Sequence, residues 1–453
     1  MQRGLYCPLF CRNYFMKIKV SKYNIFTKLN SNCVACFNTL RNSLLLLDEE
    51  VYIALQNKRL DLLDKATTDL LETNGIVLES SIDEFCLYKY LRNKKIFDTS
   101  HFYVFLTLTT ACNCACRYCF QADRKVRKNE YLSEKASLKI RNFITNNIKK
   151  YGSKSLQVDF FGGEPFLYFK MLKNEIEFYN KWAMLNNIKV SFRIYTNGTI
   201  LNQEMADFLS EQPISDLQIT LDGPKRIHDA NRPLLNGKSS FELILRNLLS
   251  LKKRLVPFIL RINFDKNSVN YYEELLNNLC ECGLEGISVY PYPVQAMTPS
   301  CGTYGEAITD KDIIKLLPNL LEAALKKGFE VPLKPNSGYI YCGSSKFTSF
   351  VIDLNAQPFK CALLQEKDAN KIGSINKDGE LVDINSEYYK WFSRDPTEIA
   401  SCRKCKMLPL CNGGCAGSAV HKYGTYFINN CYENNISIFK RKLKLYLTYC
   451  LKS

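Results

Sequence analysis

The stretch that decides the fold spans residues 102–120 and reads FYVFLTLTTACNCACRYCF. Residues 102–108 are rich in aromatic and apolar side chains, which predicts a buried strand. Directly behind it, Cys112, Cys116 and Cys119 share one short loop at Cys-x3-Cys-x2-Cys spacing. Thiolates at this spacing suit three irons of a [4Fe-4S] cube and leave the fourth open for a small molecule, whereas clusters that only carry electrons normally take four protein thiolates. Cys114 lies off this spacing, and we interpret it as a bystander.

Downstream of this stretch, strand-like and helix-like segments alternate. Apolar runs predict strands at 102–108, 156–161, 190–195, 217–221, 258–263 and 287–292. Amphipathic segments such as 133–149 and 241–248 predict helices between them. Six such repeats predict an α/β fold in which a parallel sheet curls into a partial (β/α)6 TIM-like barrel, with functional loops at the carboxyl ends of the strands.

The two ends of the chain have other patterns. Segment 23–86 predicts a small α+β module, with strands at 23–29, 33–39 and 76–78 and helices at 48–56 and 60–73. After a helix at 313–327 the chain becomes rich in loops and cysteines, so metal binding is expected to supply part of its folding free energy. The expected domains are an N-terminal extension at 1–15, the α+β module at 16–100, the barrel at 101–300 and a cysteine-rich domain at 301–453.

The composition excludes several classes of protein. Of the 453 residues, 46% are hydrophobic and 23% charged, and no run of 18 apolar residues predicts a membrane span. The first residues lack the apolar core of a signal peptide, so the 20 cysteines favour metal ligation in a reducing cytoplasm over disulfides. The net charge of +16 fits a lysine-rich solvated surface or attraction of an acidic peptide or nucleic acid. No stripe of aromatic and basic residues supports a nucleic-acid partner.

Three further motifs follow the ends of predicted strands. They are Gly162-Gly163-Glu164-Pro165, Tyr195-Thr196-Asn197-Gly198 and Leu221-Asp222-Gly223-Pro224, the last followed by Arg232. The glycines allow the backbone to approach a ligand, and Glu164 with nearby carbonyls can accept hydrogen bonds from an ammonium group. Each motif alone could be a plain turn. In this order behind the cysteine triad, they resemble the radical S-adenosylmethionine (radical SAM) family.

This resemblance implies a cofactor set and a role for each residue. Cys112, Cys116 and Cys119 would hold a [4Fe-4S] cluster whose open iron binds S-adenosylmethionine, and an external low-potential electron donor would drive its cleavage to a 5′-deoxyadenosyl radical. The resemblance also implies the contacts around that molecule: Tyr118 would lie against the adenine, Gly162, Gly163, Glu164 and Pro165 would bind the amino group, and Thr196 and Asn197 would face the ribose. Arg232 would hold a carboxylate of cofactor or substrate. No side chain identifies itself as the catalytic base.

A second series of cysteines lies near the C-terminus. It consists of Cys342, Cys361, Cys402, Cys405, Cys411, Cys415 and Cys431. The compact middle alone could be a zinc site, but seven cysteines exceed one zinc ion. The series resembles the SPASM domain of radical SAM enzymes, which holds two auxiliary [4Fe-4S] clusters.

By that resemblance, Cys402, Cys405, Cys411 and Cys431 would bind one auxiliary cluster completely, and Cys342, Cys361 and Cys415 would bind the other. Ala356 stands where the family usually has glycine, and no cysteine lies shortly before Cys342. The inner cluster would therefore recruit Cys301 or keep an open iron that could bind a substrate thiolate.

The resemblance favours maturation of a ribosomally made peptide through a thioether or carbon-carbon crosslink. The α+β module loosely resembles the leader-recognition domain of such maturases, which would add the leader of a short cysteine-containing precursor as an edge strand. The alternatives are an anaerobic sulfatase maturase that makes formylglycine, which usually starts close to the cysteine loop, and a non-catalytic iron-sulfur electron carrier. A carrier would not need the Gly162-Gly163-Glu164-Pro165 motif.

Overall fold

The structure is a computed structural model that describes residues 18–119, 121, 129–295, 304–336, 338–340, 342–365, 368–431 and 436–450. It divides into two compact units, one ending at Tyr90 and the other beginning at Leu91. The expected extension at 1–15 and Cys301 lie outside the described residues.

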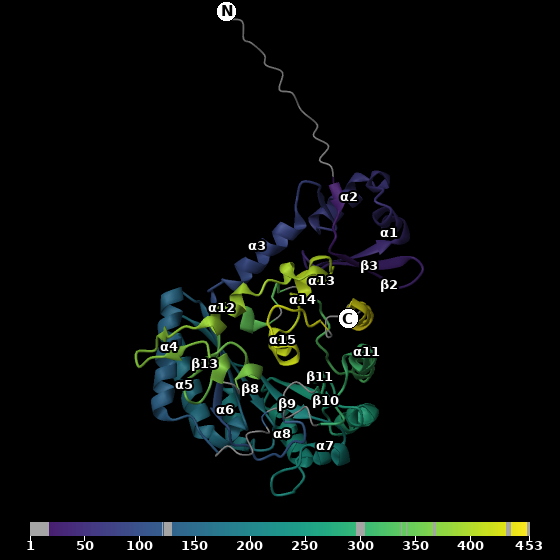
Figure 1. Ribbon diagram of the computed structural model, residues 1–453. Helices are drawn as coiled ribbons and strands as arrows, with labels where there is room; N and C mark the ends of the chain where they lie inside the picture. Colours follow the sequence, from purple (N-terminus) through teal and green to yellow (C-terminus); the bar gives the residue numbers. More distant parts are fainter. Residues whose placement is uncertain are drawn as a thin grey trace, which may run out of the picture. The chain divides into compact units, whose positions relative to one another are not determined.

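The first unit is a small α+β fold (Figure 1). Its elements are β1 (Ile18–Val20), β2 (Asn24–Lys28), β3 (Cys33–Asn38), β4 (Ser43–Asp48), α1 (Glu49–Gln56), α2 (Lys65–Thr73) and β5 (Val77–Glu79). Strand β3 pairs antiparallel with β2 and β4, which are the two outer strands of this sheet, and β1 pairs with β5. A core that includes Cys36, Leu47, Leu55 and Leu71 joins the sheet to the helices.

Several features of this unit differ from the expectation. The sequence analysis missed β4, because its run of four leucines does not alternate with polar residues as a half-buried strand does. The predicted helix at 60–73 is also divided, since the Asp64 side chain accepts a hydrogen bond from Thr67 N at 2.7 Å and so starts α2 at Lys65. Helix α3 (Glu84–Ile96), which was not predicted, follows β5.

The second unit contains the predicted α/β sheet, and all six expected strands are confirmed. They are β6 (His101–Thr109), β7 (Ser155–Gly162), β8 (Lys189–Thr196), β9 (Ile214–Leu221), β10 (Phe258–Phe264) and β11 (Ser288–Pro293). They lie parallel in sequence order. The connecting helices are α4 (Glu134–Tyr151), α5 (Phe169–Leu185), α6 (Gln203–Ser210), α7 (Lys225–Asn231), α8 (Phe241–Lys253) and α9 (Tyr272–Glu281), and α11 (Asp310–Lys326) follows β11.

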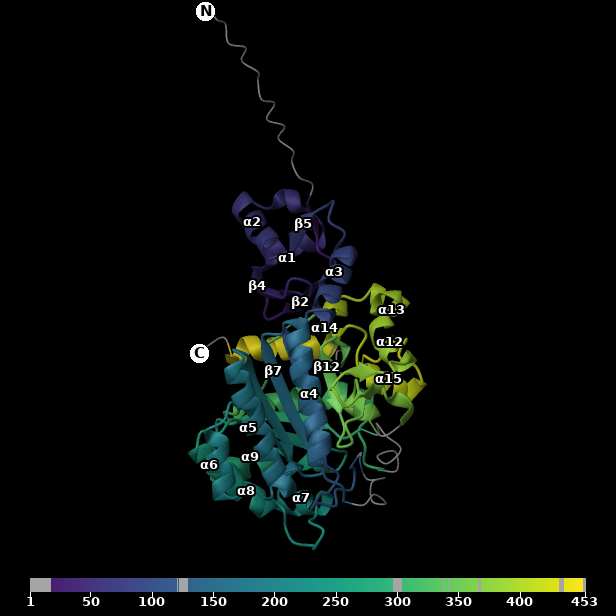
Figure 2. The same cartoon turned by 90° about the vertical axis from the view of Figure 1, so that its left-hand side faces the viewer.

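Helices pack against one face of this sheet. Figure 2 shows α4 and α5 lying along the sheet beside β7 and β12. Phe102, Val104 and Leu106 of β6 point into the core with Ile140 and Phe143 of α4. Because side chains alternate along a strand, the residues between them face the opposite, inner side of the partial barrel.

The C-terminal region is more regular than expected. Strand β12 (Ser349–Ile352) pairs parallel with β6 and antiparallel with β13 (Pro358–Phe359), which extends the main sheet to eight strands. Such short strands form through pairing with a distant segment, and local sequence patterns do not report that pairing. The remaining elements are β14 (Ser374–Ile375), β15 (Leu381–Val382), α12 (Ser386–Ser393), α13 (Ala400–Arg403), α14 (Leu408–Cys411), α15 (Ala416–Tyr423) and α16 (Ile436–Leu445).

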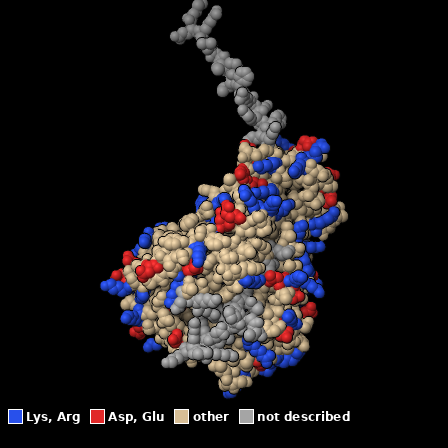
Figure 3. All heavy atoms as spheres, viewed as in Figure 1, with Lys and Arg blue, Asp and Glu red and all other residues tan. Residues whose placement is uncertain are grey.

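The surface and the helices agree with the charge and hydropathy of the sequence. Figure 3 shows lysine and arginine side chains interspersed with acidic ones over the face that it presents of the second unit. Within the described ranges, no helix is long and apolar enough to cross a bilayer.

Ala356 lies in the hairpin between β12 and β13, at the position where the resemblance leads us to expect glycine. Its φ is +58°, in the left-handed region that favours glycine, and its methyl group is fully buried. For alanine this conformation costs roughly 1–2 kcal/mol, which is close to what burial of one methyl group contributes, about 0.8 kcal/mol.

We expect Ala356→Gly to change the free energy of unfolding by less than about 1 kcal/mol, since relief of backbone strain offsets the lost methyl contact. The matched control is Ala324→Gly, at an equally buried alanine inside helix α11. There the loss of helix propensity and of methyl burial add to about 2 kcal/mol. Urea titration of both variants measures the difference, and equal losses would contradict this account.

Candidate active site and cysteine groups

The cysteine triad sits on the loop that leaves the carboxyl end of β6. A segment after α7 supports this loop: Ala115 N donates to Pro233 O at 2.8 Å, and Arg117 N donates to Asn231 O at 3.0 Å. This pairing places Arg232 beside the triad. Hydrogen bonding from the Cys114 thiol and then the charge of Arg232 lower the pKa of Cys116 to about 6.

The other thiols of the loop differ in their electrostatics. Hydrogen bonding from Cys114 lowers the pKa of Cys112, whereas burial and then the charge of Cys116 raise the pKa of Cys119 to about 12. Cys114, the expected bystander, therefore lies within hydrogen-bonding reach of Cys112 and Cys116. The protein thus favours the thiolate of Cys116 near neutral pH, whereas Cys119 would need a metal to ionise there.

Gly162 and Gly163 bring the end of β7 against the start of the cysteine loop. Gly163 N donates to Thr109 O at 2.8 Å, and Glu164 N donates to Ala111 O at 2.8 Å. A Cβ atom at Gly163 would lie 2.1 Å from Ala111 O, and one at Gly162 would lie 2.2 Å from Thr109 O. The sequence analysis expected these glycines to approach a ligand, and the structure shows that their own chain already requires them.

Glu164 joins this motif to the loop after β8. Its fully buried carboxylate accepts hydrogen bonds from Thr196 Oγ1 at 2.8 Å, Asn197 N at 2.7 Å and Phe166 N at 3.1 Å. Burial raises the pKa of Glu164 to about 7. Pro165 is buried at the start of the short helical turn that follows. One cluster beside the cysteine loop therefore consists of Glu164, Thr196 and Asn197. Asn197 also contacts the loop itself, because its Nδ2 donates to Asn113 Oδ1 at 2.8 Å.

A second polar cluster surrounds the Tyr118 hydroxyl. The hydroxyl donates a hydrogen bond to Asp222 Oδ2 at 2.6 Å and accepts hydrogen bonds from Arg232 Nη1 at 3.0 Å and Asn263 Nδ2 at 2.9 Å. These contacts fix the ring next to the triad. Asp222 and Asn263 were not among the predicted site residues. Their positions at the carboxyl ends of β9 and β10 were the signal that could have found them, since parallel strands gather functional side chains there.

Arg232 carries an enclosed positive charge. Burial opposes ionisation, but the negative charges of Cys116 and Asp222 hold its pKa well above the ordinary value. Its Nε is buried and has no hydrogen-bond partner among the described residues, because Asp222 Oδ1 lies 4.0 Å away. A buried donor without an acceptor is unfavourable, so this atom fits the carboxylate that the sequence analysis assigned to Arg232.

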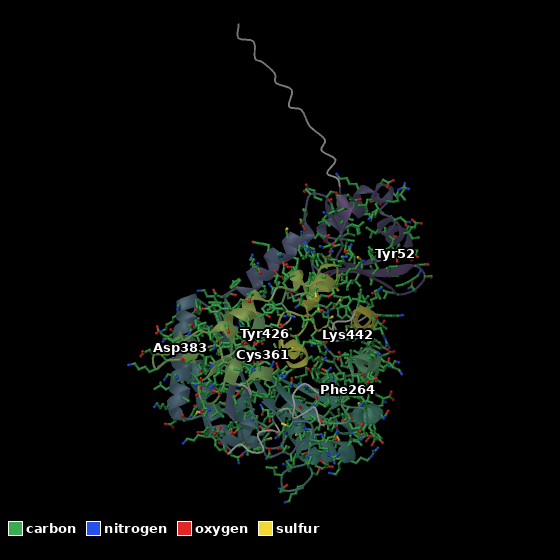
Figure 4. The ribbon with its side chains drawn as sticks, viewed as in Figure 1. Tyr52, Phe264, Cys361, Asp383, Tyr426 and Lys442 are labelled. Carbon is green, nitrogen blue, oxygen red and sulfur yellow. The ribbon has the colours of Figure 1, made fainter. Side chains whose placement is uncertain are left out.

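The C-terminal cysteines form two separate groups. Burial and then the charge of Cys415 raise the pKa of both Cys342 and Cys361, so these three thiols are neighbours. Cys361 packs in a cluster with Trp391 and Tyr426. Figure 4 shows Cys361 next to Tyr426. Backbone geometry suits thiolates here, because Ser418 N, at the start of α15, donates to Cys415 Sγ at 3.4 Å.

The other group consists of Cys402, Cys405, Cys411 and Cys431. Burial and then the charges of the other three raise the pKa of Cys411 to about 12, and burial, Cys431 and Cys405 raise the pKa of Cys402 to about 11. The two groups meet where Gly414 pairs with Asn430, so closely that a Cβ on Gly414 would lie 1.6 Å from Asn430 O.

The guanidinium of Arg394 lies between these groups. It is buried and donates to the carbonyl oxygens of Tyr426 at 2.7 Å, Asn412 at 2.9 Å and Gly413 at 2.9 Å. The pKa of Arg394 is lowered, first by burial and then by the charge of Arg92. The charges of Cys342, Cys402 and Cys415 oppose this shift. The sequence analysis gave Arg394 no role, although it ties together the loops that carry both groups.

Both C-terminal groups consist of cysteine thiols, which bind zinc ions as well as iron-sulfur clusters. In the part of the chain that the structure describes, no three His, Cys, Asp or Glu side chains converge tightly enough to hold a single metal ion. In an iron-sulfur cube each thiolate binds a different iron, so its ligands stand further apart than those of a tetrahedral zinc. The thiols of these groups are donors of the type that iron-sulfur clusters take, in line with the expectation from the sequence.

Comparison with known proteins identifies relatives of this arrangement. Residues 106–279 match the Radical SAM superfamily. The chain is 24% identical over 364 residues to a cysteine-type anaerobic sulfatase-maturating enzyme of Clostridium novyi, a match that covers 76% of this chain and 95% of that protein. It is 22% identical over 456 residues to the radical SAM cyclopropyl synthase TigE of Paramaledivibacter caminithermalis, covering 90% of this chain and 91% of TigE.

A solved structure shares the fold. Streptococcus suis SuiB bound to its precursor peptide SuiA aligns with a TM-score of 0.55 at 14% identity, and the alignment covers 92% of this chain and 100% of that one.

We expect Gly163→Ala to destabilise the protein by roughly 2–4 kcal/mol, because the added methyl group would overlap the carbonyl oxygen of Ala111, which also accepts the hydrogen bond from Glu164 N. Iron bound at the cysteine loop should fall with it. Gly305→Ala is the matched control, since a Cβ there meets nothing within 4 Å. Urea titration and iron content of both variants test this, and a stable, iron-replete Gly163→Ala protein would refute it.

Proposed function

This chain belongs to the radical SAM superfamily, and on that premise we propose that it matures a ribosomally made peptide by a thioether or carbon-carbon crosslink. The chain is an enzyme of this superfamily, and its relatives include maturating enzymes and a synthase. The observation that carries the proposal is the separate α+β unit ending at Tyr90, which precedes the barrel. The similarity to TigE extends over 90% of the chain, whereas that to the sulfatase-maturating enzyme covers 76%.

The α+β unit offers an edge to an extended peptide. Strand β4 is an outer strand, and its leucines are largely half-buried or exposed, with Leu46 exposed by 57%. An exposed apolar edge strand tends to aggregate unless a partner covers it. A leader peptide that pairs with β4 would satisfy the free backbone groups and cover the leucines.

The residues around the triad would hold the cofactors. When bound, S-adenosylmethionine and a [4Fe-4S] cluster on Cys112, Cys116 and Cys119 would supply a radical that abstracts hydrogen from an unactivated carbon. Arg232 would orient a carboxylate through its buried Nε, and the cluster of Glu164, Thr196 and Asn197 would keep the amino and ribose contacts in register. Tyr118 is held in place by Asp222 and Asn263.

The C-terminal groups would hold auxiliary [4Fe-4S] clusters of a SPASM domain, one on Cys402, Cys405, Cys411 and Cys431 and the other on Cys342, Cys361 and Cys415. Arg394 would stabilise both by offsetting negative charge in a buried place. When bound there, such clusters would supply electron-transfer chemistry, and an external low-potential donor would provide electrons.

Sulfatase maturation is the second candidate, because the match covers 95% of the length of that relative. The two candidates differ in their substrate. Anaerobically reconstituted protein is incubated with S-adenosylmethionine, dithionite and either a short cysteine-containing precursor peptide, sought among the reading frames next to the gene, or a peptide with a sulfatase cysteine motif. We expect the precursor peptide to lose two hydrogen atoms per crosslink in mass spectrometry. Aldehyde formation on the other peptide alone, or cofactor cleavage with both peptides unchanged, would reject the crosslinking proposal.

A surface variant tests the leader-binding edge. We expect Leu46→Asp to weaken binding of the precursor peptide about tenfold, because it places a charge on the apolar edge that the leader would cover. Leu70→Asp, at a leucine of α2 that is exposed by 54%, is the control and should keep the affinity. Fluorescence anisotropy with labelled peptide measures both, and equal affinities of the two variants would locate the leader elsewhere.

A further inference from the structure

Two arginines lie on the inner face of the sheet and differ in what they bind. Arg193 of β8 has its charge matched, since Nε lies 2.9 Å from both Asp216 carboxylate oxygens and Nη2 lies 2.7 Å from Oδ2. The Asp159 carboxylate is a further 3.9 Å neighbour. Arg193 therefore serves as a structural ion pair within the sheet.

Arg261 of β10 has no such partner. Leu260 and Ile262 on either side of it point into the core, so Arg261 faces the inner side. Its Nε donates to Asn263 Oδ1 at 2.8 Å, and its guanidinium lies 3.7 Å from the centre of the Tyr292 ring. Within the described part of the chain, neither Nη group has a hydrogen-bond acceptor and no carboxylate pairs with this half-buried cation.

Arg261 is one side chain away from the cysteine loop. Asn263, which accepts from Arg261, donates through Nδ2 to the Tyr118 hydroxyl at 2.9 Å. The strand register places Arg261 beside Thr220 of β9 and Tyr290 of β11. A group bound to Arg261 would therefore lie on the inner face of the sheet, next to the site where the proposed function places the reaction.

The geometry of this arginine suits a carboxylate. Stacking on Tyr292 fixes the plane of the guanidinium, and the hydrogen bond from Nε to Asn263 fixes the orientation of the guanidinium within that plane. The Nη edge that remains presents parallel N–H donors, which match the two oxygens of a carboxylate. The carboxylate of the cofactor is better placed at Arg232, whose buried Nε lies beside Cys116 and lacks an acceptor.

We propose that Arg261 binds a carboxylate of the peptide substrate and so selects peptides with an acidic group near the residue that reacts. This inference rests on the proposed function and adds the chemical class of its substrate. The carboxylate is an aspartate or glutamate side chain or the C-terminus, which the test distinguishes. Arg261 is a specificity-determining residue in this role, and it takes no part in the cleavage of the cofactor.

The test uses full-length reconstituted enzyme with S-adenosylmethionine and a fluorescent form of the short cysteine-containing precursor peptide sought among the reading frames next to the gene. Its variants have each aspartate and glutamate changed in turn to asparagine or glutamine, and one has an amidated C-terminus. Binding is measured without reductant, and KM and kcat are measured with reductant. A hydrogen-bonded charge pair is worth about 1.5–3 kcal/mol, so Arg261→Gln should raise Kd and KM about 10- to 100-fold and change kcat much less.

One neutralised peptide should show the same loss with the wild-type enzyme and no further loss with Arg261→Gln, because the two changes remove the same contact. Arg261→Lys should recover only part of the affinity, since lysine lacks the planar fork. Arg246→Gln, an exposed position on α8, is the control for loss of a positive charge and should bind the parent peptide normally.

Three results would overturn the proposal. The first is equal binding of every neutralised peptide by the wild-type enzyme, and the second is additive losses of affinity when a neutralised peptide is combined with Arg261→Gln. The third is a loss of affinity for S-adenosylmethionine in Arg261→Gln, which would assign Arg261 to the cofactor. The binding assay needs no turnover, so a peptide that binds through Arg261 and is not modified would reject the proposed function alone. A peptide with a sulfatase cysteine motif and its neutralised forms give the same comparison if the precursor peptide does not bind.

Discussion

Keeping ionisable thiols and charged arginines inside the protein is the physical constraint around which the larger unit is arranged. A charge transferred from water into a protein interior is strongly unfavourable unless an opposite charge or several hydrogen-bond donors accompany it. Arg232 supplies that charge beside Cys116, and Arg394 supplies it between the two C-terminal cysteine groups. Both guanidiniums are themselves held by the protein, Arg232 by the Tyr118 hydroxyl and Arg394 by backbone carbonyls. The buried arginines and the thiols therefore stabilise each other electrostatically in the protein interior.

Close backbone contact is the second means by which the fold brings its sites together. Gly163 lets β7 touch the start of the cysteine loop, and Gly414 lets the loops of Cys411, Cys415 and Cys431 meet. Both are positions where any side chain would overlap a carbonyl oxygen of the neighbouring segment. The glycines of motifs that suggest ligand binding thus also have a structural role. Substitution of these glycines is expected to affect folding first and activity only as a consequence.

The sequence predicted the features that depend on local pattern. Alternating strands and helices, the cysteine triad and the motifs at strand ends are all visible within short windows, and the six barrel strands appear where they were expected. Strand β4 was missed because four successive leucines hide its alternation, and β12 was missed because four residues gain strand structure only by pairing with β6. Arg261 looked like an ordinary strand residue, since only the structure shows that it donates to Asn263 and lies against the Tyr292 ring.

The pairing of β12 with β6 has a consequence for how the protein can be divided. Strand β6, which delivers the cysteine loop, is an inner strand of the sheet only because the C-terminal hairpin covers its side. A fragment that ended after the barrel would expose a long apolar strand with unpaired backbone groups, which is a template for self-association. Excision of the C-terminal region would thus give an insoluble core rather than a simpler enzyme, and the two halves of this unit have to evolve and be engineered as one piece.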